Sequence, residues 1–210
     1  YSNVYLLPSP VEIVESFTFL IQSRYIFKDI FTSLARVFSG FSIGAVFGLV
    51  FGVIFSYSTT ARTLFSSWIE IIRPIPPLAW IPLSILWFGL GNKSAIFLVA
   101  LGSFFPVYSN TVEGITALPK KFIDAAKTLG AGSKMIFLEV VTPAVLPYVL
   151  TGLKIGLGVS WMIVITAELV GSTSGLGYFI QLNRTLLQID NVFAGMVIIG
   201  IVGFLMNSLL

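Results

Sequence analysis

The chain of 210 residues contains no cysteine and no histidine. Disulfides and thiolate chemistry are therefore excluded, and so are imidazole metal ligands and histidine-based acid–base catalysis. Charged residues make up only 10% of the sequence, against roughly 25% in soluble domains. The formal net charge of +3 is small and dispersed, so it does not indicate binding to nucleic acid. Together these absences exclude most classes of enzyme.

Hydrophobic residues, by contrast, make up 56% of the sequence, and the mean hydropathy is +0.97. These values indicate an integral membrane protein. The chain opens with YSNVYLLPSP, which has no basic region typical of a secretory signal peptide. We predict an all-α, polytopic membrane helix bundle that forms a single domain over residues 1–210.

Windows without charge locate the expected spans, because a helix needs about 20 apolar residues to cross the hydrocarbon core. Residues 1–37 are expected to form an outer leader, with an amphipathic helix near residues 10–23. Five spans are predicted, three within residues 38–112 and two within residues 143–210, and their windows are 38–56, 74–92, 94–112, 143–170 and 191–210. The polar segment 113–142 joins the third span to the fourth.

The distribution of lysine and arginine predicts the orientation of the chain. With the leader set aside, most of these residues lie on the side of segment 113–142, which places that segment in the cytoplasm. The last window stops at Leu210 without a basic anchor. We therefore expect further residues beyond it, and an earlier span before the leader.

Four glycines recur every four residues in the first predicted span: Gly40, Gly44, Gly48 and Gly52. On a helix this spacing makes one smooth groove, as in the small-xxx-small interfaces of membrane helices. Their predicted role is close helix packing.

The stretch RPIPPLAWIP, residues 73–82, contains four prolines. Each proline removes a backbone donor and clashes with the preceding turn, so no regular helix runs through it. Irregular backbone at membrane depth is tolerated where it packs in protein or lines a wet cavity. The stretch is thus either a kink that serves packing or part of a transport pathway, for which the predicted wall residues are Pro76, Pro77, Trp80, Ser84, Ser103, Asn110, Lys154 and Trp161.

Lys154 interrupts the fourth predicted span. A charge near the membrane centre costs roughly 2.5–3.5 kcal/mol, and snorkelling toward the interface reduces that cost. A lysine that faced a pore would favour anions, whereas a snorkelling one would be structural. Glu168 lies about 21 Å further along the same helix, so it is not the partner of Lys154 within one chain.

The segment LPKKFIDAAKTLGAGSKMIF, residues 118–137, is the longest polar interruption of the chain. Its apolar residues recur at helical spacing before two glycines, which predicts a short amphipathic helix. A helix of about ten residues is not stable alone in water, so it must dock on a surface. Alanines keep the apolar face shallow, which suits a groove on another protein better than lipid.

The sequence DAAKTLGAGSKMIFLEVVTP, residues 124–143, resembles the EAA motif of ATP-binding-cassette (ABC) importer permeases. That motif has an acid, two alanines, three residues, a glycine, nine residues and a closing Ile-x-Leu-Pro. Asp124 stands for the usual glutamate, and Val140 and Thr142 depart mildly from the closing residues. LPSP, RPIPPLAWIPLSILWFGLG and AELVGSTSGLGYFI extend the resemblance to nearly the whole chain, in the branch of sulfonate, taurine, nitrate and bicarbonate importers.

The resemblance implies a type I ABC importer permease in the bacterial plasma (inner) membrane. The implied partners are a second copy of the permease, two cytoplasmic ATPase subunits and an extracytoplasmic substrate-binding protein, in contact with membrane lipid and with no nucleic acid. The short amphipathic helix would be the coupling helix that fits a cleft on the ATPase. The implied coupling residues are Phe122, Asp124, Ala125, Ala126, Lys127, Leu129 and Gly130.

The chain is expected to be a non-catalytic transport subunit with no cofactor and no metal of its own. It lacks a P-loop, so ATP and Mg²⁺ are expected in the partner ATPase. Gln181 and Leu182 follow GLGYFI, where nitrate and bicarbonate members carry a Trp-Asp pair. The solute implied is therefore a small oxyanion such as an aliphatic sulfonate or taurine. Nitrate, bicarbonate or another small nutrient is the alternative, and an ATP-independent secondary transporter or channel is a remote one.

Overall fold

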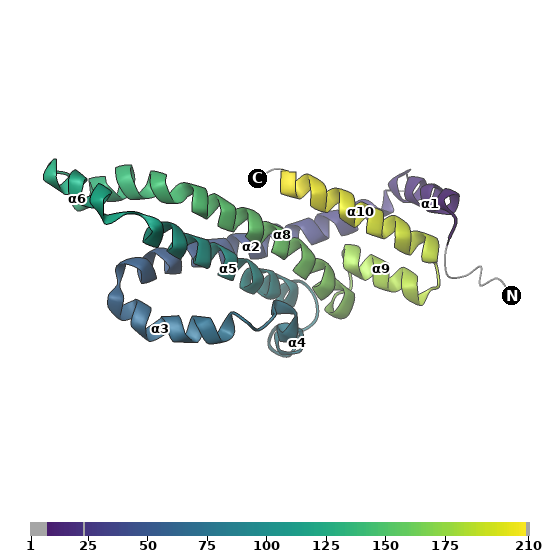
Figure 1. Ribbon diagram of the computed structural model, residues 1–210. Helices are drawn as coiled ribbons and strands as arrows, with labels where there is room; N and C mark the ends of the chain where they lie inside the picture. Colours follow the sequence, from purple (N-terminus) through teal and green to yellow (C-terminus); the bar gives the residue numbers. More distant parts are fainter. Residues whose placement is uncertain (1–7, 23, 209–210) are drawn as a thin grey trace.

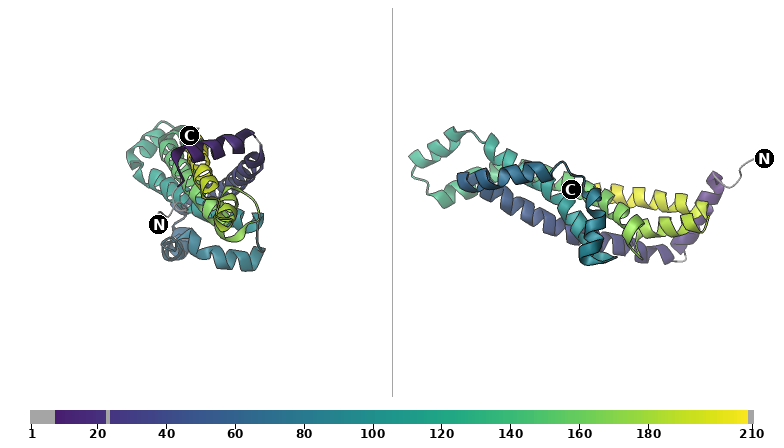
Figure 2. Two further views of the ribbon diagram at one scale, coloured as in Figure 1. Left: turned by 90° about the vertical axis from the view of Figure 1, so that its right-hand side faces the viewer. Right: turned by 90° about the horizontal axis from the view of Figure 1, so that it is seen from below.

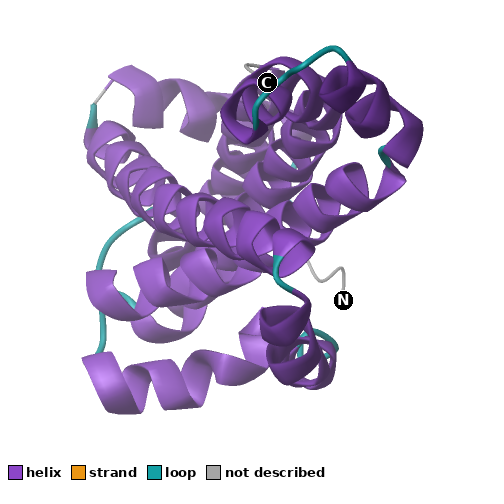
Figure 3. Cartoon of the chain, turned by 90° about the vertical axis from the view of Figure 1, so that its left-hand side faces the viewer, coloured by secondary structure: helices purple, strands orange, loops and turns teal. Residues whose placement is uncertain are grey.

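The computed structural model describes residues 8–22 and 24–208, and every regular element in these residues is a helix (Figures 1 and 3). The predicted all-α membrane bundle is confirmed. In chain order the elements are α1 (Pro10–Gln22), α2 (Tyr25–Tyr57), α3 (Thr59–Ile72), the 3₁₀ helix η1 (Pro77–Trp80), α4 (Ile81–Phe88), α5 (Asn92–Ala117), α6 (Lys120–Thr128), α7 (Ser133–Met135), the π-helical segment η2 (Ile136–Val141), α8 (Thr142–Gly171), α9 (Leu176–Thr185) and α10 (Ile189–Ser208).

Four helices in the described residues are long and apolar enough to cross a membrane: Ile26–Tyr57, Asn92–Ala117, Ser133–Gly171 and Ile189–Ser208. The predicted span at residues 74–92 is different, because its apolar helical part is only Pro77–Phe88 and consists of η1 and α4. The prolines break the helix there, as their chemistry requires. The predicted interruption of regular helix at the prolines is therefore present, and this span is not one long helix.

The direction of the long helices explains what the broken stretch does. α2 and α5 run parallel, and α8 runs antiparallel to both (Figure 1). The chain that leaves α2 at one end must return before α5 begins, and α3, η1 and α4 together make that return (Figures 1 and 2). The second crossing is thus made in pieces rather than by one helix.

Several boundaries differ from those predicted. α2 begins at Tyr25, so Lys28 and Arg36 belong to this helix and not to an outer leader. α5 continues to Ala117 and helix resumes at Ser133, which shortens the predicted polar segment 113–142 to residues 118–132 around α6. The apolar windows stopped at charged residues that the structure places inside helices, Arg36 in α2 and Glu113 in α5.

The glycine ladder lies at the contact between α2 and α5. Each glycine meets the residue 59 positions later in the chain, in the pairs Gly40–Val99, Gly44–Ser103, Gly48–Val107 and Gly52–Thr111. A Cβ atom added to Gly40 would lie 2.6 Å from the Cβ atom of Val99. The two helices therefore approach so closely that no side chain fits between them.

The bundle is elongated, with α6 projecting at one end and α1 and α9 at the other (Figures 1 and 2). Its main apolar core joins residues of α2, α5, α8, α9 and α10. A second, smaller apolar cluster lies beneath α6. These two ends hold the sites described next.

Candidate functional site

The backbone of α6 is defined by the residues at its two ends. Pro119 precedes the helix, and its carbonyl oxygen accepts a hydrogen bond from the Phe122 N–H group (3.1 Å). At the other end the Gly130 N–H group donates to the Lys127 carbonyl (2.9 Å) and the Ala131 N–H group donates to the Ala126 carbonyl (3.0 Å). This is the Schellman arrangement, and it places Gly130 in the left-handed region with φ +82°. The glycine of the motif thus has a backbone reason for its position.

One face of α6 packs on its own chain. Ile123 and Ala126 contact the small cluster formed by Ile136, Val141 and Val145 at the base of α8. This contact stabilises a nine-residue helix that would not persist alone. The sequence argument did not predict this contact within the chain, and docking of α6 on another protein stays a prediction.

The rest of α6 is uncovered, and we call Phe122, Ala125 and Leu129, which lie beside the packed residues, its outward face. Phe122 is 50% exposed, Leu129 is 88% exposed, and Ala125 is exposed as well. The Lys121 ammonium lies 5.4 Å from the centre of the Phe122 ring, within cation–π distance. A cavity of about 260 Å³ lies beside Phe122. The outward face is a shallow apolar surface bordered by lysine side chains.

The other predicted coupling residues fall into two groups. Asp124, Lys127 and Gly130 are exposed, whereas Ala126 is half-buried against its own chain. The structure thus divides the two alanines of the motif, with Ala125 turned outward and Ala126 turned inward.

Three of the predicted pathway residues are buried inside the chain. Ser84 and Ser103 are 0% exposed and Trp161 is 8% exposed. The Ser84 hydroxyl bonds to the Ser94 hydroxyl (2.6 Å), and the Ser103 hydroxyl donates to the Val99 carbonyl (2.9 Å). Their burial does not fit a place on the wall of a pathway, which corrects this part of the prediction. Periodicity had given no information about which helix face turns inward.

The remaining pathway residues do not line the cavity beside Phe122 or a second one next to Arg36. Pro76 and Lys154 are exposed, and Pro77, Trp80 and Asn110 are half-buried. The Asn110 side-chain amide donates to the Pro106 carbonyl of its own helix (2.8 Å). A role for these five in lining a pathway stays a prediction.

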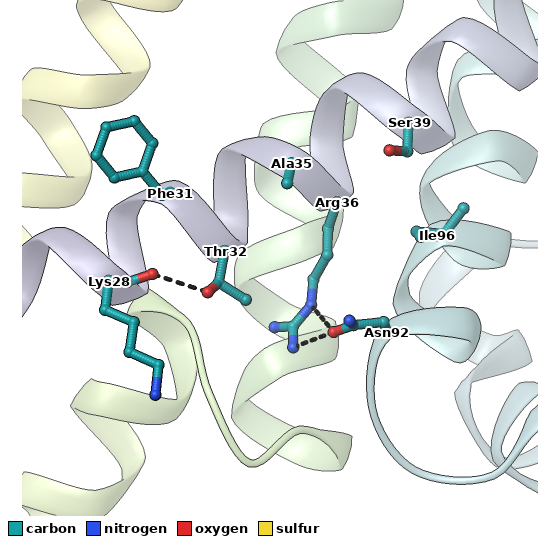
Figure 4. Close-up of a pocket in the computed structure, with 8 residues that line it drawn as sticks. All are labelled: Lys28, Phe31, Thr32, Ala35, Arg36, Ser39, Asn92 and Ile96. Atoms are coloured by element: carbon teal, nitrogen blue, oxygen red, sulfur yellow. Dashed lines mark hydrogen bonds between the residues drawn. The ribbon is translucent and has the colours of Figure 1, made fainter.

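A buried ion pair lies toward the other end of the bundle, between Arg36 of α2 and Glu168 of α8. The Nη1–Oε1 distance is 2.7 Å, and the two side chains are 3% and 0% exposed. Arg36 also donates to the Asn92 side-chain oxygen from Nε (2.8 Å) and Nη2 (2.6 Å), as Figure 4 shows. Two further bonds reach the Ser174 carbonyl from Nη1 (2.7 Å) and its hydroxyl from Nη2 (2.9 Å). All five N–H donors of the guanidinium group therefore have an acceptor.

The carboxylate of Glu168 lies at the start of α9, a helix with no side-chain cap of its own. Acceptors from α2 and α8 take three consecutive N–H groups there: Asp29 takes that of Gly175 (2.7 Å), Ser33 that of Leu176 (2.9 Å) and Glu168 that of Gly177 (3.0 Å). The Ser33 hydroxyl in turn donates to Glu168 (2.8 Å). Negative groups at a helix N-terminus satisfy its free donors and its dipole. We call Arg36 and Glu168 with these contacts the clasp.

Sequence reasoning missed the clasp. The sequence places Arg36 in the outer leader and offers Glu168 no partner, since Lys154 lies too far away on the same helix. A usable signal existed, because ionisable residues inside apolar helices are rare and usually paired. The pairing itself, across 132 positions of the chain, could not be read from the sequence.

A cavity of about 460 Å³ opens beside Arg36 (Figure 4). Its lining includes Lys28, Phe31, Thr32 and Asn92. Because every donor of Arg36 is already bonded, the guanidinium group has no free donor to offer to a molecule in this cavity.

Residues 44–210 match the family described as "Binding-protein-dependent transport system inner membrane component". The chain belongs to this family. The match covers the glycine ladder from Gly44 onward, the broken proline stretch, α6 and Glu168, so the predicted permease family is confirmed.

Individual relatives agree with this assignment. The chain is 44% identical to a putative ABC transporter permease protein of Methanocaldococcus jannaschii over 83% of this chain and 66% of that protein. It is 40% identical to the putative aliphatic sulfonates transport permease protein SsuC of Bacillus subtilis (97% of this chain, 74% of SsuC). It is 35% identical to the taurine transport system permease protein TauC of Escherichia coli (96% of this chain, 75% of TauC). The chain thus spans 66% to 75% of the length of these relatives.

A chain of the methionine ABC transporter MetNI, solved in inward-facing conformations, shares the fold with a TM-score of 0.67. Identity is 21%, and the alignment covers 87% of this chain and 93% of that chain. The expected type I importer permease fold is therefore confirmed.

Proposed function

We propose that this chain is the transmembrane permease subunit of an ATP-driven importer that moves a small solute into the cytoplasm. Two copies would form the pathway between them, two ATPase subunits would bind on the α6 side, and an extracytoplasmic binding protein would deliver the solute. The protein would span a bacterial plasma membrane with α6 in the cytoplasm. The observation that carries the proposal is the outward face of α6.

The position of α6 supports a role as a lever. A displacement of the outward face would be transmitted by the packing of Ile123 and Ala126 on the small apolar cluster at the base of α8. The helical segment from Ser133 to Gly171 has 39 residues, which corresponds to about 58 Å at 1.5 Å per residue. Movement of an ATPase subunit at α6 would therefore be carried to the opposite end of the bundle.

ATP hydrolysis belongs to the separate subunits in this proposal, and no cofactor is assigned to this chain. The solute proposed is a small oxyanion such as an aliphatic sulfonate or taurine, in line with the names of SsuC and TauC. A nitrate import permease of Synechocystis is 30% identical over 96% of this chain, which supports nitrate as the alternative. Competition for uptake among sulfonates, taurine, nitrate and bicarbonate distinguishes these solutes.

A bulky substitution on the outward face tests the proposal. Ala125→Trp would hold the ATPase cleft away from α6, so ATPase co-purification and ATP-driven uptake in vesicles should both be lost. Val14→Trp is the control, because Val14 is 63% exposed but lies on α1 at the far end of the bundle (Figure 1). Normal ATP-driven uptake by Ala125→Trp would contradict the lever. Uptake by the wild-type complex without ATP would favour a secondary transporter or channel.

A further inference from the structure

We infer that Arg36 and Glu168 are positioning residues for transport, which fix the start of α9 to α2 and to the far end of α8. The inference rests on the proposed importer function. It assigns the clasp to the transmission of movement rather than to binding of the solute.

Stability alone gives no reason for such a pair. Two charges buried in a helix bundle cost several kcal/mol each before they are paired, and apolar replacement of a buried ion pair is often neutral or stabilising. An ionisable residue inside the membrane therefore indicates a functional role. Arg36 is 2% exposed and Glu168 is 1% exposed, and each has the other as its partner.

Binding of the solute is also a poor explanation. A small oxyanion in the cavity beside Arg36 would need donors, but all five N–H groups of Arg36 are bonded within the chain. Any contact with a solute would break one of these bonds. The cluster is therefore a closed internal network.

The clasp holds α9 without any space for adjustment. A Cβ atom on Gly175 would overlap the Glu168 carboxylate, and one on Gly177 would lie 2.7 Å from the Glu168 Cβ atom. Gly175 also has φ +103°, which a residue with a side chain rarely adopts. The turn and the start of α9 are seated directly on Glu168, and three of their N–H groups are bonded to α2 and α8.

Glu168 lies one turn before the end of α8, the helix that starts beside α6. Figure 1 shows this helix running the length of the bundle between the two ends. When α6 moves α8, the hydrogen bond from Gly177 to Glu168 therefore moves α9 as well. The ion pair between Arg36 and Glu168 moves α2 together with them. Without the clasp, α8 would move while α9 stayed behind.

The experiment compares uptake with ATP hydrolysis in the assembled complex, in vesicles with the binding protein present. The variants are Glu168→Gln and the double variant Arg36→Met with Glu168→Met, which removes both charges and keeps apolar volume. Ser16→Ala is the matched control, since it removes a hydrogen bond to Asp190 (2.7 Å) that joins α1 to α10 at the same end.

We expect both clasp variants to insert, assemble and hydrolyse ATP, while the solute taken up per ATP falls about tenfold, within the range usual for coupling between sites. Ser16→Ala should keep the wild-type ratio. A double variant with the wild-type ratio would overturn the inference, and so would a parallel loss of uptake and hydrolysis. Failure of the wild-type complex to import with ATP would instead refute the proposed function.

A second measurement stays informative if Glu168→Gln, which leaves Arg36 as an unpaired buried charge, does not insert. The chain has no cysteine, so a single cysteine at the exposed Arg184 of α9 gives one site for a thiol reagent. Its labelling rate should differ between nucleotide-free and ATP-bound complexes. In the background of the double variant that difference should disappear, and an unchanged difference would overturn the inference.

Discussion

The close approach of α2 and α5 makes a quantitative prediction for Gly40→Ala. The new Cβ atom would lie 2.6 Å from the Cβ atom of Val99 and 2.7 Å from the carbonyl oxygen of Ile96, whereas ordinary contact begins at 3.4 Å. One obstacle is backbone and the other is the base of a side chain, so neither can rotate away. The helices would have to part by about 0.8 Å, and overpacking of this kind costs about 1–3 kcal/mol.

Gly200→Ala is the matched control for this prediction. Gly200 is also inside a helix, α10, but no atom lies within 4 Å of the Cβ position. Both variants gain the same roughly 0.5–1 kcal/mol of helix preference over glycine, so their difference isolates the cost of the contact.

Thermal unfolding of the purified protein in detergent measures that difference. For a chain of this length 1 kcal/mol corresponds to about 2–4 °C in Tm. Gly40→Ala should therefore unfold several degrees below Gly200→Ala. Equal Tm values for the two variants would refute the close approach of α2 and α5.

Two further predictions concern left-handed backbone. Gly130→Ala should destabilise the end of α6 by about 1–2 kcal/mol, because Gly130 has positive φ. Gly132 has negative φ, so Gly132→Ala is the control. Amide hydrogen exchange in α6 should rise for Gly130→Ala and stay unchanged for Gly132→Ala, and equal exchange in both would contradict the cap. Leu187 is 81% exposed and has φ +58°. Leu187→Gly should therefore remove backbone strain of about 1 kcal/mol and raise Tm by about 2–4 °C. A lower Tm would show that the leucine side chain stabilises the turn.

Local sequence chemistry predicted much of this fold. The scarcity of charge indicated membrane helices, and the prolines at positions 74, 76, 77 and 82 excluded a regular span where the structure has η1 and α4. The segment around α6 was predicted from its spacing, although its length was overestimated. These features depend on residues close together in the chain, so a single sequence is enough to reveal them.

Burial and pairing were beyond the same reasoning. The sequence predicts Ser84 and Ser103 as pathway residues, yet both are buried and bonded inside the chain. Apolar surroundings lie on all sides of a membrane helix, so hydrophobic periodicity does not distinguish a face in lipid from a face in protein.

By itself, the sequence determined that the protein is a helical membrane permease, where its helices break, and which segment forms the short helix between long ones. Only the tertiary structure decided that α2 and α5 run parallel and touch along the glycines of α2. It also decided that Ala126 turns inward while Ala125 turns outward, and that Arg36 pairs with Glu168. The physical reason is distance along the chain: spacing within a helix sets which residues share a face, whereas the helix that this face meets depends on how the whole chain packs.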